Sequence, residues 1–259
     1  MKTIILCGGI GTRLKEETEF KPKPLVHIGD RPILWHIMKI YQHYGFNEFV
    51  LTLGYKGSMI KDYFLNYNSL VHDFTLKTNT SEINNRSSVK DDFIITFAET
   101  GLKNLTGSRI LQVEKYIDDD TFMLTYGDGV ADVNVKELVD FHKKQGTIAT
   151  ITGVHPYSKY GQLQIDHGSN LVREFKQKPL MNDYVNGGLM VLNKEAFNYF
   201  DEDQMEKGLS RLAQEGQLSV FKHDGFWKAM DTYQEMQELN ELWQSTKPWA
   251  VWKNSSDIK

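Results

Sequence analysis

The chain has 259 residues, of which 40% are hydrophobic and 25% charged, a composition typical of a globular protein with one large domain. The formal net charge of −4 argues against broad attraction to nucleic acid, and no apolar run approaches the ~20 residues that a membrane span needs. We therefore expect neither a nucleic-acid nor a membrane partner. The N-terminus lacks the layout of a signal peptide, and the single cysteine, Cys7, cannot form an internal disulfide, so we expect a reducing cytoplasm.

The N-terminal half alternates short apolar runs with amphipathic stretches. Residues 3–7 form a short apolar run that ends at glycine, which predicts a buried strand. Residues 31–44 carry apolar side chains at helical spacing between Asp30, the expected N-cap, and Gly45, the expected stop. Further strands are expected at 48–53, 93–98, 121–126 and 147–154, and further helices at 58–66, 108–117 and 135–145. This alternation predicts an α/β fold with a Rossmann-like, mainly parallel sheet flanked by helices.

Two later regions depart from this rhythm. Residues 66–92 are polar, rich in Asn and Ser and weakly periodic, so they form either an exposed excursion or an arm that contacts another subunit. Shorter strands are expected at 162–165, 171–175, 188–192 and 217–222, as a smaller, substrate-facing β region of the same sheet. The last helix is expected to begin at the capping-box pattern of Thr232 and Glu235. Its expected inner face consists of Tyr233, Met236, Leu239 and Trp243.

The sequence "LCGGIGTRL" at positions 6–14 places three glycines directly after the first expected strand. Glycines in that place let backbone amides approach a phosphate, but neither familiar template fits. A dinucleotide-binding G-x-G-x-x-G that starts at Gly9 would need glycine in place of Leu14. A P-loop that starts at Gly8 would need glycine in place of Arg13. Positive groups that could hold an anion gather beside the loop, at Arg13, Lys15, Lys21 and Lys23.

Two aspartates are candidate metal ligands. Asp128, in "YGDG", follows the strand expected at 121–126, and the carboxyl ends of parallel strands share one edge. An aspartate there is often only a turn residue, but a triphosphate site needs Mg²⁺, which takes one or two carboxylates plus phosphate oxygens. Asp231, in "GFWKAMDT", is the second candidate, and its alternative role is helix N-terminal electrostatics. Asp132 is a local competitor, whereas residues 118–120 are expected to form a solvated turn.

Two basic stretches carry further candidates for anion binding. In "KPKP", Lys21 and Lys23 stand beside prolines, which limits the backbone freedom lost on binding. Either lysine could instead be solvated. The stretch "TGSR" at 106–109 is either a helix start or a contact of its backbone and Arg109 with a base or phosphates.

The candidate residues belong to a longer sequence pattern that resembles a known family. The stretch "GGIGTRLKEETEFKPKPL" resembles the G-G-x-G-x-R-L…P-K signature of the sugar-1-phosphate nucleotidylyltransferases, and the likeness covers nearly the whole chain. It continues through "RPILWHIMKIY", "GYKG", "TYGDGVAD", "KP…VNGG", "GFW…MDT" and "KPWAVWK". Within that family the chain is similar to the members that use CTP and glucose 1-phosphate. The resemblance implies attack of a sugar 1-phosphate on the α-phosphorus of CTP with release of pyrophosphate, Mg²⁺ as cofactor, and a homo-oligomer.

The resemblance also implies roles by position. A single domain would have a nucleotide-binding part at about 1–155 and a sugar-phosphate-binding part at about 156–259. The implied nucleotide contacts are Leu6, Gly8, Gly9, Gly11, Thr12, Arg13, Lys23, Thr106 and Arg109. The implied sugar-phosphate contacts are Gln177, Lys178, Asn186, Gly187 and Gly188. Asp128 and Asp231 would share the Mg²⁺ and, with Arg13 and Lys23, form the catalytic set.

One departure from the family pattern keeps alternatives open. Gln177 stands where the family usually has glutamate. A carboxylate accepts hydrogen bonds from sugar hydroxyls, whereas an amide both accepts and donates, so another acceptor phosphate, or UTP or dTTP, is an alternative. A non-catalytic binding module is disfavoured by the presence of both Asp128 and Asp231. A dinucleotide-dependent oxidoreductase is disfavoured by Leu14.

Overall fold

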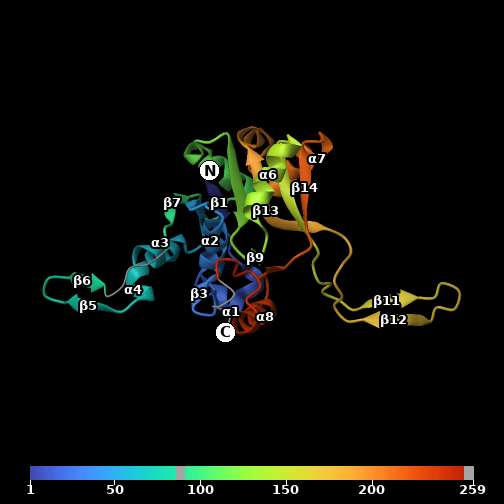
Figure 1. Ribbon diagram of the computed structural model, residues 1–259, viewed down its shortest axis with the longest axis horizontal. Helices are drawn as coiled ribbons and strands as arrows, with labels where there is room; N and C mark the ends of the chain where they lie inside the picture. Colours follow the sequence, from blue (N-terminus) through green and yellow to red (C-terminus); the bar gives the residue numbers. More distant parts are fainter. Residues whose placement is uncertain (86–90, 254–259) are drawn as a thin grey trace.

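The computed structural model describes residues 1–85 and 91–253, and its centre is one mixed β-sheet (Figure 1). In spatial order the seven strands are β14 (Leu218–His223), β10 (Ala149–Val154), β13 (Val185–Asn193), β8 (Thr121–Tyr126), β1 (Thr3–Leu6), β4 (Glu48–Leu53) and β7 (Ile94–Glu99). Neighbouring strands are parallel except where β13 meets β10 and β8. The predicted α/β class with a mainly parallel sheet is therefore confirmed.

Helices cover both faces of this sheet. Consecutive residues of β1 show the two sides, because Ile5 packs in one core cluster and Ile4 in the other. The first cluster includes side chains of α2 (Ile33–His43), α3 (Gly57–Leu65), α6 (Val135–Gln145) and α8 (Tyr233–Gln244). The second includes side chains of α5 (Thr106–Val113) and α7 (Met205–Gln214). Within residues 1–85 and 91–253, no helix has the length and apolar character of a bilayer-spanning segment.

Short elements connect these layers. They are α1 (Lys15–Thr18), the paired β2 (His27–Ile28) and β3 (Arg31–Pro32), α4 (Tyr67–Val71), and 3₁₀ turns at Thr12–Leu14, Lys23–Leu25, Glu114–Tyr116 and Lys194–Tyr199. The β2–β3 ladder corrects one expectation. Because Arg31 and Pro32 pair with β2, α2 begins at Ile33 and its N-cap is Pro32, not Asp30.

Two β-hairpins leave the body of the molecule in opposite directions (Figure 1). The first arm is β5 (Phe74–Lys77) with β6 (Glu82–Asn85), and the second arm is β11 (Gln162–Ile165) with β12 (Val172–Lys176). Of the shorter strands expected after residue 160, β13 and β14 join the central sheet as predicted. The prediction that β11 and β12 join it was wrong, since they pair only with each other. Residues 86–90 of the expected excursion lie outside the described residues.

A small ladder brings two distant aspartates together. The strand β9 (Gly129–Ala131) follows Asp128, and β15 (Trp227–Ala229) precedes Asp231 by two positions. These strands are antiparallel, with Ala229 opposite Gly129, and the Met230 N–H donates to the Asp128 carbonyl at 2.8 Å. Backbone pairing therefore fixes the two carboxylates beside each other at the edge where β1 and β8 end.

The C-terminal helix is held by an aromatic cluster and by its cap. Buried His36 donates from Nε2 to the Ile28 carbonyl at 3.0 Å and accepts from Trp249 Nε1 at 3.2 Å, which fixes a neutral tautomer. Burial lowers the pKa of His36 to about 4, consistent with that neutral state. Trp243 and Leu239 are buried as expected, but Tyr233, placed on the inner face by the sequence pattern, is exposed.

The predicted capping box of α8 is present and gives a stability prediction. Thr232 Oγ1 accepts the Glu235 N–H at 3.3 Å, and Glu235 Oε2 accepts the N–H groups of Thr232 and Asp231 at 2.8 Å each. Thr232→Ala should therefore lower the free energy of unfolding by about 1 kcal/mol. Urea denaturation of the variant and the wild type measures this change in the free energy of unfolding. Thr80→Ala, in the turn of the first arm, is the control. Equal stabilities of the two variants would contradict a contribution from this cap.

Candidate active site

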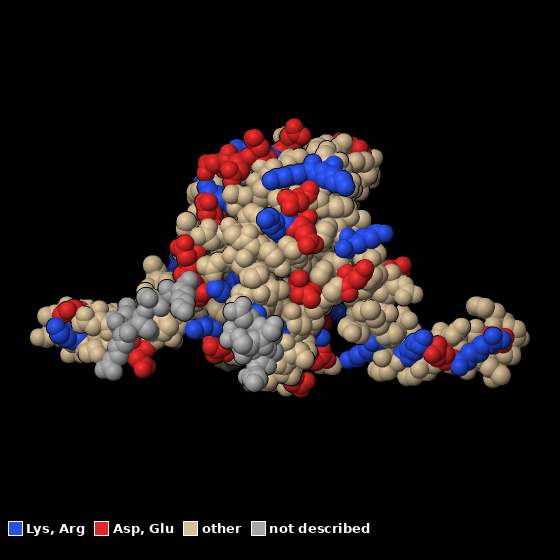
Figure 2. Space-filling view, in the orientation of Figure 1, with Lys and Arg blue, Asp and Glu red and all other residues tan. Residues whose placement is uncertain are grey.

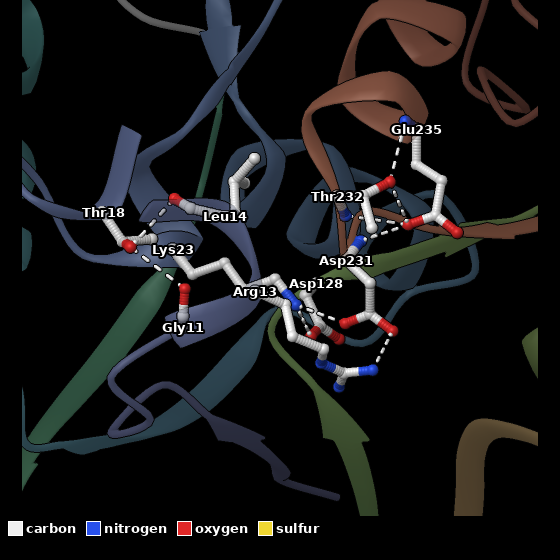
Figure 3. A network of polar contacts seen from close by, with 9 residues as sticks. All are labelled: Gly11, Arg13, Leu14, Thr18, Lys23, Asp128, Asp231, Thr232 and Glu235. Atoms are coloured by element: carbon white, nitrogen blue, oxygen red, sulfur yellow. Dashed lines mark hydrogen bonds and ion pairs between the residues drawn. The ribbon is translucent and has the colours of Figure 1, made fainter. Parts of the chain in front are cut away.

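One lysine ammonium lies between the two aspartates (Figure 3). Lys23 Nζ is 2.6 Å from Asp128 Oδ2 and 2.7 Å from Asp231 Oδ1. The lysine side chain is only 11% exposed, so these contacts are largely shielded from solvent. Arg13 adds a second positive charge, with Nη1 2.9 Å from Asp231 Oδ2, but its side chain is 68% exposed. The structure thus brings together all four residues of the implied catalytic set.

The charges in this cluster stabilise one another. Burial alone would lower the pKa of the Lys23 ammonium, but the charges and hydrogen bonds of Asp128 and Asp231 outweigh burial and raise that pKa. Burial would raise the pKa of the Asp231 carboxyl, but the hydrogen bond and charge of Lys23, with the charge of Arg13, hold it below its ordinary value. The Lys23 ammonium and the Asp231 carboxylate are therefore both ionised around neutral pH.

The glycine loop between β1 and α1 has a conformation that only glycine fits at Gly11. Its φ is +70°, in the left-handed region, and an added Cβ would lie 2.8 Å from Thr18 Cγ2. Thr18 Oγ1 donates to the carbonyls of Gly11 at 3.0 Å and Leu14 at 2.9 Å, which fixes the turn. The turn that follows presents Thr12 and Arg13 at the end of β1.

Arg109 supports this loop from below. Its guanidinium is buried and donates to the carbonyls of Gly8 at 3.1 Å and Leu53 at 3.2 Å and to Thr100 Oγ1 at 2.7 Å. Thr106, at the start of the same helix, accepts the Met205 N–H at 2.7 Å. The observed contacts of both residues are therefore with the protein, and their direct contact with a nucleotide stays a prediction.

Two adjoining cavities open at this edge of the sheet. The first, which we name the loop cavity, has a volume of about 220 Å³. It is lined by Leu6, Cys7, Gly9, Gly11, Thr12, Arg13, Lys23, Pro24, Gly127 and Asp128. The second, the strand-end cavity, has a volume of about 330 Å³. It is lined by Arg13, Thr125, Tyr126, Asp128, Gly129, Asn186, Gly187, Glu206, Trp227, Ala229 and Asp231. Because Arg13 and Asp128 line both, the two cavities form one continuous site.

Some expected contacts are not in the linings given for these two cavities. Gln177 and Lys178 are not among the described residues that line either cavity. They follow β12 at the base of the second arm. Gly188 has φ of +87°, and an added Cβ there would lie 2.6 Å from the Tyr126 ring. Its role is to let β13 pass close to Tyr126. Contact of Gln177 and Lys178 with a sugar phosphate stays a prediction.

The competing aspartate, Asp132, has other partners. Its Oδ1 lies 2.8 Å from His223 Nε2 and accepts the Phe226 N–H at 2.7 Å. These contacts fasten the loop before β15. Asp132 therefore supports the ladder that carries Asp231, and the cavity carboxylates at the end of β8 and before α8 are Asp128 and Asp231.

Several lining residues were not proposed from the sequence, among them Tyr126, Glu206 and Trp227. Tyr126 and Trp227 lie inside the quoted stretches "TYGDGVAD" and "GFW". Those motifs indicate a site nearby, but they do not indicate that these two side chains line it. Glu206 belongs to α7 and lies in no motif. Only the packing of α7 brings it to the cavity.

Comparison with known proteins shows the family to which the chain belongs. Residues 2–245 match the model of the family described as nucleotidyl transferase, so the chain belongs to that family. It is 46% identical over 257 residues to a Bacillus subtilis (strain 168) protein named "Probable glucose-1-phosphate cytidylyltransferase", across 97% of this chain and 100% of that protein. It is 42% identical over 259 residues to the glucose-1-phosphate cytidylyltransferase of Salmonella typhi, across 98% of this chain and 100% of the relative.

Solved structures of more distant proteins show the same fold. HddC from Yersinia pseudotuberculosis superposes with a TM-score of 0.67 at 23% identity, over 93% of this chain and 99% of that one. A UDP-glucose pyrophosphorylase complexed with UDP-glucose gives a TM-score of 0.67 at 16% identity, over 93% and 97%. At such identities the likeness concerns the fold alone.

The support of the glycine loop by Arg109 can be tested with two neighbouring glycines. An added Cβ at Gly8 would lie 2.0 Å from Arg109 Nη1, whereas one at Gly9 meets nothing within 4 Å. Since Arg109 is buried and hydrogen-bonded, it cannot easily give way. Gly8→Ala should lower the free energy of unfolding by ~1–3 kcal/mol, and Gly9→Ala should leave it near the wild-type value. Denaturant unfolding without ligands measures both, and a Gly8→Ala variant as stable as Gly9→Ala would overturn the packing argument.

Proposed function

We propose that the protein transfers the cytidylyl group of CTP to α-D-glucose 1-phosphate, giving CDP-glucose and pyrophosphate. The observation that carries this is the joined site itself, where a glycine loop, two cations and two carboxylates meet at one sheet edge. The choice of CTP and glucose 1-phosphate rests on the full-length similarity to glucose-1-phosphate cytidylyltransferases.

The two cavities divide the substrates between them. The loop cavity receives the triphosphate, because backbone N–H groups of the glycine loop and the cations Arg13 and Lys23 favour its charge. The strand-end cavity receives the sugar phosphate, whose phosphate approaches the α-phosphorus past Arg13. The attacking phosphate oxygen is already ionised, so the protein needs no general base, and positioning and charge stabilisation carry the reaction.

The donor set fits a single divalent cation. Asp128 and Asp231 direct one oxygen each at the same ammonium, so their spacing suits one shared positive centre. No cluster of three or more His, Cys, Asp or Glu ligands exists among the described residues, but Mg²⁺ completes its shell with water and phosphate oxygens. We infer that these two aspartates hold Mg²⁺, which would neutralise charge on the phosphates. Lys23 and Arg13 would then bind the triphosphate.

A homo-oligomer in the cytoplasm completes this proposal. Both arms are two-stranded hairpins in the described part of the chain, and they carry these exposed apolar side chains: Phe74, Leu76, Ile83, Leu163, Ile165, Val172 and Phe175. Charges of both signs lie between them, as Figure 2 shows for both arms. Isolated hairpins of this kind are marginally stable in water, so we propose that other copies of the chain cover them. The free, buried thiol of Cys7 suits a reducing compartment.

A substrate matrix tests the reaction. Pyrophosphate release is measured for the four ribonucleoside triphosphates and dTTP, each against several sugar 1-phosphates. The pair of CTP and glucose 1-phosphate should give the highest kcat/KM. A higher value with UTP, dTTP or another sugar 1-phosphate would replace the proposed substrates. Binding without any pyrophosphate release would replace catalysis with a binding role.

The metal carboxylates give a second prediction. Asp128→Asn and Asp231→Asn should each lower turnover at least ~100-fold, because a metal-based charge effect of ~3 kcal/mol is lost. Both should also weaken Mn²⁺ binding in electron paramagnetic resonance titrations. Asp140→Asn, on the exposed face of α6, is the matched control and should keep turnover near the wild-type value. Near-normal turnover of either variant at saturating Mg²⁺ would remove that aspartate from the metal site.

The arms give a third prediction. Phe175→Asp, which places a charge on the second arm, should reduce the molar mass measured by light scattering after size-exclusion chromatography to that of a smaller assembly. Lys136→Asp, on the exposed face of α6, should leave the mass unchanged. A monomeric wild-type protein at micromolar concentration would contradict the proposed role of the arms.

A further inference from the structure

Tyr126 and Glu206 form a pair on the wall of the strand-end cavity. Tyr126, the last residue of β8, donates its hydroxyl to Glu206 Oε1 at 2.5 Å, and both residues line the cavity. Neither residue belongs to the charged cluster of Arg13, Lys23, Asp128 and Asp231. The pair lies where β8 and α7 meet, with Gly188 packed against the Tyr126 ring.

The position of Glu206 is fixed by the start of α7. The Met205 N–H donates to Thr106 Oγ1 at 2.7 Å, and that hydroxyl donates to Gln204 Oε1 at 3.2 Å. The Gly107 N–H donates to the Asp203 carbonyl at 2.8 Å, so two successive residues of α5 hold this segment. Glu206 is in the first turn of α7, where the helix dipole favours a negative charge.

Glu206 keeps accepting capacity for a ligand. Within residues 1–85 and 91–253, the ion pairs of α7 are those of Lys207 with Asp203 and Arg211 with Asp201, and Glu206 joins neither. The other two carboxylates of the cavity, Asp128 and Asp231, are engaged by cations. After the bond from Tyr126, Glu206 therefore retains a carboxylate oxygen and further lone pairs.

The cavity is consequently polarised. Arg13 supplies positive charge where it adjoins the loop cavity, and Glu206 supplies negative charge on another wall. A carboxylate repels a phosphate but accepts charge-assisted hydrogen bonds from hydroxyl groups. Trp227 adds a flat wall, and its indole N–H is already donated to the Gly187 carbonyl at 2.7 Å. Glu206 is thus the cavity's available anionic acceptor for a polyhydroxylated ring.

We propose that Glu206, oriented by Tyr126, binds a hydroxyl of the acceptor sugar and makes the site selective for a hexose phosphate that carries it. The inference rests on the proposed function, because it needs a sugar phosphate in the strand-end cavity. Glu206 then does what the sequence pattern assigns to position 177, where this chain has Gln177 outside the cavity lining.

The test compares two Tyr–Glu pairs whose glutamates lie at opposite ends of α7. Glu206→Gln should raise the KM for glucose 1-phosphate about 10-fold or more, with the KM for CTP and the thermal unfolding unchanged. Tyr126→Phe should have a smaller effect of the same kind, because the charge remains but its orientation is lost. The controls are Glu215→Gln and Tyr199→Phe, since Tyr199 donates to Glu215 Oε2 at 2.6 Å, outside the site. They should behave as the wild type.

Deoxy analogues identify the hydroxyl and separate binding from a structural role. The wild-type enzyme and Glu206→Gln are assayed with the 2-, 3-, 4- and 6-deoxy forms of glucose 1-phosphate. For one analogue the difference between the two proteins should vanish, because both lack the same hydrogen bond. An unchanged KM in Glu206→Gln, or an equal defect with every analogue, would overturn the inference.

This outcome is distinct from failure of the proposed function. If the wild-type protein prefers another sugar phosphate, the proposed substrate fails, and the same comparison is made with that acceptor and its deoxy analogues. If the protein turns over no acceptor, calorimetric titration of the sugar phosphates measures binding directly. Equal affinity of wild type and Glu206→Gln for each of them would then reject Glu206 as a ligand.

Discussion

The site depends on one buried ammonium group that holds two carboxylates together. Asp128 and Asp231 lie 105 and 208 positions from Lys23 in the chain, and without a cation between them their charges would repel. Lys23 makes the pair compatible before any substrate arrives. In the proposed reaction the same lysine would serve the phosphates, so a metal ion would replace it between the two carboxylates. The protein thus brings the two carboxylates together with a charge of its own.

Sheet topology explains why this exchange happens at one edge. Leu6 and Tyr126 are register partners at the ends of β1 and β8, so the glycine loop and Asp128 start side by side. The antiparallel β13 enters the sheet from that same edge, which places Asn186 and Gly187 there at its beginning. A strand in the opposite direction thus contributes its first residues where its neighbours contribute their ends. The position of Asn186 and Gly187 in the lining of the strand-end cavity follows from this reversal.

How much the sequence could predict differs between residues for physical reasons. Asp128 was predictable because strand ends of a parallel sheet meet at one edge, and Thr232 because a capping box is local. The separate pairing of β11 with β12 was not predictable, because alternation of side chains identifies a strand but not its pairing partner. Asp30 is not the N-cap of α2, because Arg31 and Pro32 pair with β2 and the helix begins only at Ile33. Glu206 carries no local signal, as tertiary contacts alone place its helix.

The helix α5 connects the two halves of the site. Through Arg109 it holds the Gly8 carbonyl of the glycine loop, and through Thr106 it holds the start of α7, which carries Glu206. The distance between the glycine loop and Glu206 is therefore set by one short element. Nucleotidyl transfer gains most from such positioning, because it needs no covalent help from the protein. The stretch "TGSR" then has a structural role whether or not it touches the nucleotide: it fixes the distance between the glycine loop and the start of α7.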